Sequence, residues 1–225
     1  MKKVIVSWSG GKDSALAYYR IYSNGLYEIV GLLTIVFKHD DGKYYIGMHM
    51  IDIELIKLQA ELMGVELFII EYSSQDSYNH KMHEFLTYCK SQSILNIAFG
   101  DIHLQDLRKS RENNLAAVGM NAVFPIWGDK AQDVLIEFTK NGFRAIIVNV
   151  DTKYINKSVL GSQLTLDLVS LLDIDLCGEN GEYHSLVYDA PMFKQPLAFQ
   201  LTETIRIDAQ GRYFSIISQA NAEIA

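Results

Sequence analysis

The run Val4–Ala17 constrains the fold of this chain more than any other stretch of its sequence. It begins with β-branched residues, as buried parallel strands do, turns through Gly10-Gly11, and continues with apolar residues at helical spacing. A strand, a glycine turn and a helix N-terminus together direct free backbone N–H groups and a helix dipole towards an anion. The pattern therefore predicts a phosphate site directly after the first strand.

The residues of this turn supply the donors that a phosphate needs. The glycines let the main chain approach a phosphate, the serines add hydroxyl groups, and the lysine adds a positive charge. A carboxylate would repel phosphates, so we interpret Asp13 as a helix cap or a ligand of Mg²⁺. The spacing excludes a Walker A loop and a G-x-G-x-x-G turn, and a merely connecting turn is the alternative. The predicted nucleotide-binding residues here are Ser9, Gly10, Gly11, Lys12, Asp13 and Ser14.

Strand-like and helix-like segments alternate along most of the chain. Strands are predicted at 27–37, 65–71, 94–100, 122–124 and 143–150, helices at 53–63, 80–91, 104–118, 129–140 and 162–172, and a polar loop at 73–79. This alternation predicts an α/β fold with a mostly parallel, Rossmann-like sheet and helices on both faces. Near the end, 197–207 and 213–218 alternate like an antiparallel hairpin. We therefore expect a phosphate-binding α/β domain at 1–175, and a substrate-side loop with a β-rich subdomain at 176–225.

Composition excludes several classes of protein. The 225 residues fit one large α/β domain or one with a small appendage. A net charge of −7 argues against non-specific binding of nucleic acid or of an anionic membrane. Cys89 and Cys177 are far apart, so neither a disulfide framework nor a zinc site is indicated. The chain has no apolar run of the roughly 20 residues that cross a bilayer, and we expect a cytoplasmic protein without a signal peptide.

Polar residues at the predicted strand ends mark the site, because ligands of parallel sheets bind beyond the carboxyl ends of the strands. Leu32 and Thr34 are either a wall of the nucleotide pocket or plain core residues, and His49 lies in the loop beyond them. Gly100-Asp101 ends another strand, where the carboxylate either holds Mg²⁺ and orients the reacting group or caps the next helix. That helix carries three basic residues, which either form a solvated face or meet an anionic substrate: Arg108, Lys109 and Arg111.

The segment Cys177–Pro191 has the composition of a binding loop. Two carboxylates, an amide, an imidazole and a hydroxyl group lie close together beside two glycines. No packed helix or strand requires this mixture, whereas a sharply bent binding loop does. An acidic surface turn is the alternative interpretation.

The motifs of this chain resemble those of a known enzyme family. Ser9–Ser14 is similar to the PP-loop of the ATP pyrophosphatases, Ser-Gly-Gly-x-Asp-Ser. Taken in order with it, further blocks resemble the ATP-binding domain of the diphthine–ammonia ligase family, in a short single-module form: Met48-His49 with Glu54-Leu55 and Gln59-Ala60, Phe99–Ile102, Phe124–Gly128, Gly142–Asp151 and Gly178–His184.

The resemblance implies an ATP- and Mg²⁺-dependent ligase. ATP is split to AMP and pyrophosphate to adenylate the carboxylate of diphthine, a modified histidine of an elongation factor, and ammonia then displaces AMP. The implied catalytic residues are Asp101, Glu179, Glu182 and His184. The implied metal ligands are Asp13 and Asp101; Leu32, Thr34 and Gly100 would join the phosphate loop in the nucleotide site. The implied substrate-binding residues are His49, Asn180, Gly181, Tyr183 and Ser185.

Several alternatives stay open at this stage. The acceptor is either the modified protein residue or a small metabolite, and a PP-loop enzyme acting on tRNA is a rival. Sulfur transfer is disfavoured because Cys177 is the single cysteine near the predicted site. A nucleotide-binding sensor that does not turn ATP over is a rival of another class. The nitrogen donor (free ammonia or a glutaminase partner) and the oligomeric state, a homodimer among the options, are not determined by the sequence.

Overall fold

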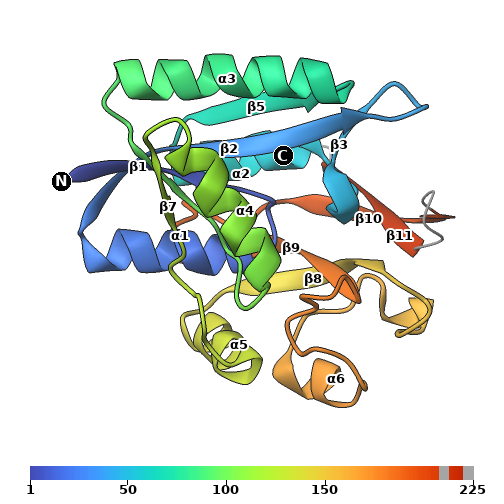
Figure 1. The fold of residues 1–225 in the computed structure, drawn as a ribbon. Coiled ribbons are helices and arrows are strands. Elements are labelled where there is room, and N and C mark those ends of the chain that lie inside the picture. The colour runs from blue at the N-terminus through green and yellow to red at the C-terminus, as the bar shows by residue number, and fades with distance from the viewer. Residues whose placement is uncertain (208–212, 220–225) are drawn as a thin grey trace.

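The computed structural model describes residues 1–207 and 213–219, and its centre is a mainly parallel sheet (Figure 1). The strands of this sheet are β1 (Lys2–Ser7), β2 (Tyr27–Lys38), β3 (Tyr44–Ile46), β4 (Ile51–Asp52), β5 (Leu67–Tyr72), β6 (Asn96–Ala98) and β7 (Asn121–Val123). β1 pairs in parallel with β2 and β6, β6 with β7, and β2 with β5, while β3 and β4 extend the β2 side antiparallel. The carboxyl ends of the parallel strands therefore share one edge.

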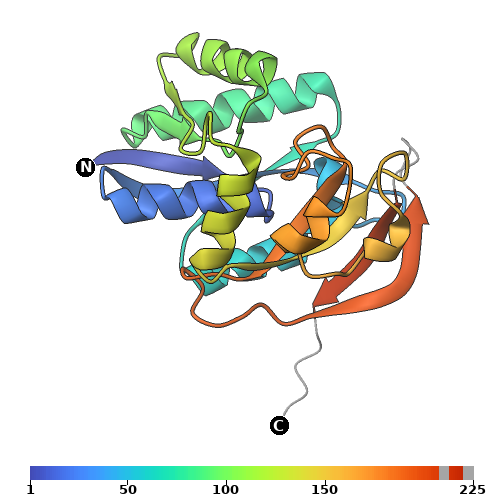
Figure 2. The ribbon, with the colours of Figure 1, turned by 90° about the horizontal axis from the view of Figure 1, so that it is seen from below.

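Helices cover both faces of this sheet, as predicted (Figure 2). The helices are α1 (Lys12–Asn24), α2 (Ile53–Met63), α3 (Gln75–Ser91), α4 (Gln105–Ala116), α5 (Ala131–Lys140) and α6 (Leu166–Ser170), with short 3₁₀ turns at Gly47–His49 and Lys157–Val159. Residues of β1 alternate between two cores: Val4 and Val6 pack with α1 and α2, whereas Ile5 packs with α3 and α4. The α/β fold class is thus confirmed.

A second, antiparallel sheet contains β8 (Arg144–Val150), β9 (Tyr183–Asp189), β10 (Phe199–Ile207) and β11 (Tyr213–Gln219), in the order β10-β11-β8-β9. The hairpin of β10 and β11 is confirmed, and its connection at 208–212 lies outside the described residues. The expectation that the strand at 143–150 continues the parallel sheet is wrong, as is the assignment of 183–189 to a loop. An apolar run reports burial on both faces, but it does not report the direction of its partner strand. Figure 1 shows α5 and α6 on the side of β8 away from the parallel sheet.

Two helix boundaries also differ from the prediction. α3 begins within the expected loop at 73–79, because Ser74 caps it by accepting a hydrogen bond from the N–H of Ser77 (3.2 Å). α6 has five residues in place of the predicted 162–172, and Thr165 caps its start. A division of the chain into domains at residue 175 stays a prediction. No helix within the described ranges has both the length and the apolar character that a membrane span requires.

Candidate active site

The phosphate loop, Ser9–Ser14, is a tightly packed turn between β1 and α1. Gly10 has a φ of +77°, and a Cβ on it would lie 2.4 Å from Cδ1 of Ile56, so only glycine fits here. The Gly10 carbonyl accepts hydrogen bonds from the Val187 N–H (2.8 Å) and from Gln59 Nε2 (3.2 Å). The loop is therefore held from β9 and α2 as well as from its own ends.

The open end of α1 faces this loop. Gly11 is the N-cap residue, and no side chain caps the helix. The Gly11 N–H donates to Ser9 Oγ (3.3 Å), and the hydroxyl groups of Ser9 and Ser14 are 3.3 Å apart. Backbone N–H groups and two hydroxyl groups thus converge where a helix dipole favours an anion.

Asp13 does not cap α1, so that interpretation was wrong. Its Oδ2 accepts a hydrogen bond from Lys12 Nζ (2.8 Å), and its Oδ1 is buried with no hydrogen-bond partner among the described residues. Burial raises the pKa of this carboxyl group, and the charge of Lys12 opposes the rise. A buried carboxylate oxygen beside a phosphate cradle fits Mg²⁺, which needs only one or two carboxylates when phosphates supply further ligands. No cluster of three or more potential protein ligands is found in the described part of the chain.

Lys12 is directed away from the phosphate cradle. Its side chain is only 4% exposed, and its ammonium group donates to the carbonyl of Cys177 and lies 5.2 Å from the ring centroid of Tyr183. Burial alone would lower the pKa of Lys12, but Asp13 and the other acidic groups around it raise it above its ordinary value. The backbone N–H of Lys12 also donates to Ser185 Oγ (3.2 Å). Lys12 therefore joins the phosphate loop to the segment around Cys177.

That segment, the acidic loop Asp175–Glu182, is organised by its own carboxylates. Glu182, 4% exposed, accepts hydrogen bonds from the Asp175 N–H (3.1 Å), the Asn180 N–H (3.0 Å) and the Asn180 side chain (3.0 Å). Asp175 Oδ1 accepts from the N–H groups of Cys177 (2.9 Å) and Glu179 (3.1 Å). These hydrogen bonds of Glu182 lie inside the loop and are suited to positioning it; the catalytic role of Glu182 stays a prediction.

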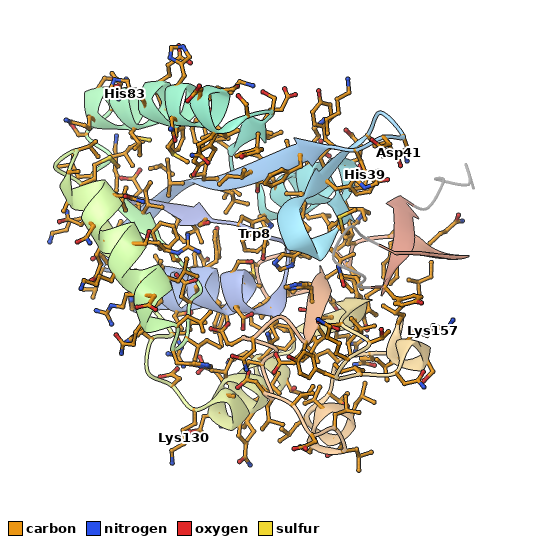
Figure 3. The ribbon with its side chains drawn as sticks, turned by 45° about the vertical axis from the view of Figure 1, so that its right-hand side comes forward. Trp8, His39, Asp41, His83, Lys130 and Lys157 are labelled. Atoms are coloured by element: carbon orange, nitrogen blue, oxygen red, sulfur yellow. The ribbon has the colours of Figure 1, made fainter. Side chains whose placement is uncertain are left out.

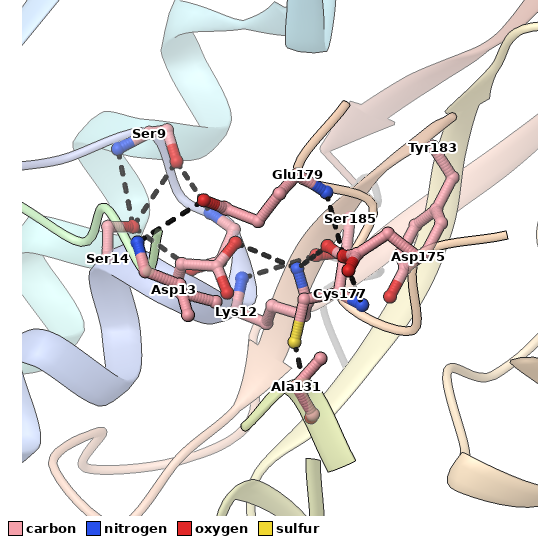
Figure 4. Close-up of polar contacts among 12 residues, drawn as sticks. Ser9, Lys12, Asp13, Ser14, Ala131, Asp175, Cys177, Glu179, Tyr183 and Ser185 are labelled. Atoms are coloured by element: carbon pink, nitrogen blue, oxygen red, sulfur yellow. Dashed lines mark hydrogen bonds and ion pairs between the residues drawn. The ribbon is translucent and has the colours of Figure 1, made fainter. Parts of the chain in front are cut away.

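Glu179 extends from the acidic loop to the phosphate loop. Figure 4 shows its side chain directed towards Ser9 and Asp13. Its Oε2 accepts a hydrogen bond from the N–H of Ile102 (3.2 Å), and burial together with the nearby Asp13 raises its pKa. Of the four predicted catalytic residues, Glu179 has a carboxylate next to the phosphate loop that also contacts the residue after Asp101.

Gly100 and Asp101 bring the end of β6 to the same place. A Cβ on Gly100 would lie 2.7 Å from the carbonyl carbon of Asp13, so this close approach requires glycine. Asp101 does not cap α4, whose N-cap is Leu104. Instead its Oδ2 lies 2.6 Å from Arg111 Nε, and its Oδ1 accepts from Arg111 Nη2 (3.1 Å). The basic cluster on α4 thus contributes one residue, Arg111, to the site.

Two histidines predicted for the site lie against each other. The ring centroids of His49 and His184 are 4.3 Å apart, with an angle of 36° between the rings. A Cβ on Gly11 would lie 3.4 Å from His49 Cε1, which places the pair beside the phosphate loop. His184 precedes Ser185 on β9, whose hydroxyl group is bonded to Lys12. The structure therefore brings the imidazoles, the phosphate loop and the acidic loop together.

The two residues predicted to line the nucleotide pocket, Leu32 and Thr34, lie in the core of the sheet. Leu32 and Thr34 are fully buried, and the Thr34 hydroxyl group donates to the carbonyl of Trp8 (2.7 Å). The next residues along β2, Leu33 and Ile35, face the opposite side of the sheet. There they line a pocket of about 350 Å³, whose other lining residues include Ser7, Phe99 and Arg111. Strand periodicity was the signal that could have found them.

Sequence reasoning also missed the supports beneath the site. Gln59 is fully buried, accepts a hydrogen bond from Trp8 Nε1 (2.8 Å), and donates to the carbonyl groups of Gly10 and Val187 (2.7 Å for Val187). Figure 3 shows Trp8 deep in the molecule, whereas Lys130 and Lys157 are at its periphery. A glutamine on the apolar face of a predicted helix was the available signal for Gln59. The sequence held no such signal for Asp175, because its hydrogen bonds to backbone N–H groups depend on the loop conformation.

Comparisons with known proteins identify the family of this chain. The family model of the diphthamide synthase N-terminal domain matches residues 2–122, and that of the C-terminal domain matches residues 130–220. The chain is 26% identical to a diphthine–ammonia ligase of Danio rerio, over 90% of this chain and 88% of that protein. It is 24% identical to that of Schizosaccharomyces pombe, over 90% of this chain but 37% of that longer protein. Among solved structures, a predicted subunit of tRNA methyltransferase from Methanocaldococcus jannaschii is similar, with 16% identity, a TM-score of 0.43, and coverage of 85% of this chain and 98% of that one.

Proposed function

The chain belongs to the diphthamide synthase family, and from this membership we propose that it is a ligase that uses ATP to join ammonia to a carboxylate. The observation that carries the proposal is the meeting of two loops. A glycine cradle at the N-terminus of α1 lies beside the carboxylates of Asp13 and Glu179, which come from different ends of the chain. Such a site suits catalysis by positioning and charge neutralisation at phosphorus.

The proposed nucleotide orientation follows from the positions of the phosphate loop and the pocket. The triphosphate binds the backbone N–H groups of the phosphate loop and the hydroxyl groups of Ser9 and Ser14, while the adenosine occupies the pocket lined by Leu33 and Phe99. Asp13, with its buried Oδ1, would hold Mg²⁺, which neutralises charge on the phosphates.

The proposed reaction has two steps. An oxygen of the acceptor carboxylate attacks the α-phosphorus of ATP, the bond from this phosphorus to the bridging oxygen breaks, and pyrophosphate leaves. Ammonia then attacks the acyl carbon of the adenylate, the bond to AMP breaks, and the nitrogen loses a proton. His184, whose ring lies against that of His49 beside the phosphate loop, accepts that proton.

The cysteine of the site supports nitrogen transfer over sulfur transfer. The Cys177 thiol donates to the carbonyl of Ala131 (3.4 Å), and burial raises its pKa to about 12. A nucleophilic sulfur must be a thiolate, which this thiol does not form at neutral pH. The acceptor we propose is diphthine, which the names of the relatives contain, carried on an elongation factor as the motif resemblance implies.

Nucleotide products test the proposal. The protein is incubated with ATP, Mg²⁺ and ammonium, with and without an elongation factor that carries diphthine, and the nucleotides are separated. We expect AMP and pyrophosphate in equal amounts, dependent on both ammonium and the acceptor. Ser9→Ala should lower the rate at least tenfold because it removes a phosphate donor, and Ser110→Ala, on the exposed side of α4, is the matched control. ADP and phosphate as products, or ATP that is bound and never cleaved, would overturn the ligase assignment.

A further inference from the structure

Arg111, on α4, lies between the pocket and the end of β6. Its guanidinium carbon is 4.2 Å from the ring centroid of Phe99, and both side chains line the pocket. Its Nε and Nη2 contact the two carboxylate oxygens of Asp101 at 2.6 and 3.1 Å. An aromatic face and a carboxylate therefore fix the orientation of this guanidinium group.

The ion pair leaves part of the guanidinium group available for a second anion. A guanidinium group carries five N–H donors. Nη2 donates a hydrogen bond to Asp101 Oδ1, and Nε forms an ion pair with Asp101 Oδ2. Among the described residues, no hydrogen bond involves Nη1. Of the pocket-lining residues within this part of the chain, Arg111 alone carries a permanent positive charge. The pocket thus has one fixed cation, and it is at the side of the pocket nearest Asp101.

The position of Arg111 relative to the phosphate loop indicates which anion it binds. Its partner Asp101 follows Gly100, which abuts the backbone of Asp13 and Ser14. The guanidinium group therefore lies on the route from the adenosine pocket to the phosphate loop. We propose that Arg111 binds the phosphate attached directly to the adenosine and thereby makes the site selective for nucleotides over nucleosides, an inference that rests on the nucleotide site proposed above.

The test compares the binding of AMP and adenosine by calorimetry in the full-length protein. Arg111→Met should weaken AMP binding about 10- to 100-fold and change adenosine binding less than threefold, because it removes a charge-assisted hydrogen bond to phosphate. Equal losses for both ligands would reveal a merely structural role, and unchanged AMP binding would show that no contact exists. Either result overturns the inference.

Two further variants separate the direct contact of Arg111 with phosphate from a general effect of charge and from the ion pair with Asp101. Lys109→Met removes the same charge from an exposed position of α4 and should leave both affinities unchanged. Asp101→Asn removes the ion pair but keeps the guanidinium group, so the preference for AMP over adenosine should persist; its loss would mean that Arg111 acts only through Asp101. Since binding needs no turnover, ATP cleavage to ADP would overturn the ligase assignment and leave this result standing. If the unaltered protein binds neither adenosine nor AMP, both the inference about Arg111 and the proposed nucleotide site are overturned.

Discussion

The two loops that meet at the site are stabilised in different ways. The phosphate loop is held by packing and backbone geometry. Gly10 has a positive φ, and its carbonyl accepts hydrogen bonds from Gln59 of α2 and Val187 of β9. The acidic loop is held by the carboxylates of Asp175 and Glu182, which accept hydrogen bonds from the loop's own N–H groups. A turn held by packing depends on the core beneath it, whereas a loop held by side chains can be altered without disturbing that core. Substitutions in the two loops should therefore have different consequences.

The largest effect is expected in the phosphate loop. Gly10→Ala should lower the free energy of unfolding by about 3 kcal/mol, because a positive φ costs a residue with a Cβ about 1–2 kcal/mol and overpacking adds about 1–3 kcal/mol. Gly25→Ala is the matched control: Gly25 also has a positive φ, but a Cβ there would meet nothing within 4 Å. Urea denaturation of both variants separates the two costs. Equal losses in the two variants would show that packing against Ile56 contributes nothing.

A smaller effect on stability, but a large one on activity, is expected in the acidic loop. Glu182→Ala removes the acceptor of three hydrogen bonds and should cost about 2 kcal/mol, since water replaces part of the lost bonding. AMP formation should fall at least a hundredfold because Glu179 is no longer held against the phosphate loop. Glu182→Gln keeps the shape and half of the acceptors, and it should recover most of the stability. Normal turnover by Glu182→Ala would contradict the positioning role assigned to this carboxylate.

The smallest effect on stability, an increase in place of a loss, is expected at Glu179, where the two loops touch. Burial raises the pKa of Glu179 above its ordinary 4.5, so the folded protein holds this proton more tightly than the unfolded chain does. The contribution of Glu179 to stability is thus fully present below pH 4.5 and is lost as the pH rises through the raised pKa. Glu179→Gln has no charge to bury, so its stability should match the unaltered protein at low pH and exceed it increasingly at higher pH.

Thermal unfolding across this pH range, with the exposed Glu66→Gln as control, measures the difference. A variant that loses stability relative to the unaltered protein as the pH rises would show that the charge of Glu179 is favourable in the fold. The same variant should lose activity, which would place this carboxylate among residues kept for catalysis at some expense of stability.

The contrast between the loops also explains what the sequence could predict. The strand, turn and helix of the phosphate loop were predicted because they follow one another locally, and its glycines reflect a backbone requirement. The direction of the Lys12 side chain and the contacts of Asp13 were not predicted, because they depend on the acidic loop. The acidic loop was predicted as a site, and the catalytic role of Glu182 stays a prediction. Its hydrogen bonds to Asp175 and Asn180 could not be predicted, because they depend on the conformation of the folded loop. Composition identifies a functional segment; it does not identify which carboxylate faces inward.

The remaining errors concern partners distant in sequence. β8 has the apolar run of a parallel strand, yet its neighbours are β9 and β11, which follow it by tens of residues. Leu32 and Thr34 stay predicted residues of the nucleotide site, while Leu33 and Ile35 line the pocket on the other face of β2. Strand periodicity separates the two faces of β2, but it does not show which helices cover each face. The partner strands of β8 and the helices that cover each face of β2 are determined by the tertiary structure.

The bond from Lys12 to the carbonyl of Cys177 has a consequence for the order in which the molecule forms. These residues are 165 positions apart, and Lys12 and Ser185 are 173 positions apart. At ordinary rates of synthesis, on the order of 5 to 20 residues per second, the phosphate loop leaves the ribosome roughly ten to thirty seconds before its partners exist. During that interval the ammonium group of Lys12 is hydrated, and the parallel sheet can form around an incomplete site. The proposed ATP site is therefore completed last, when the acidic loop packs against a phosphate loop that was synthesised first.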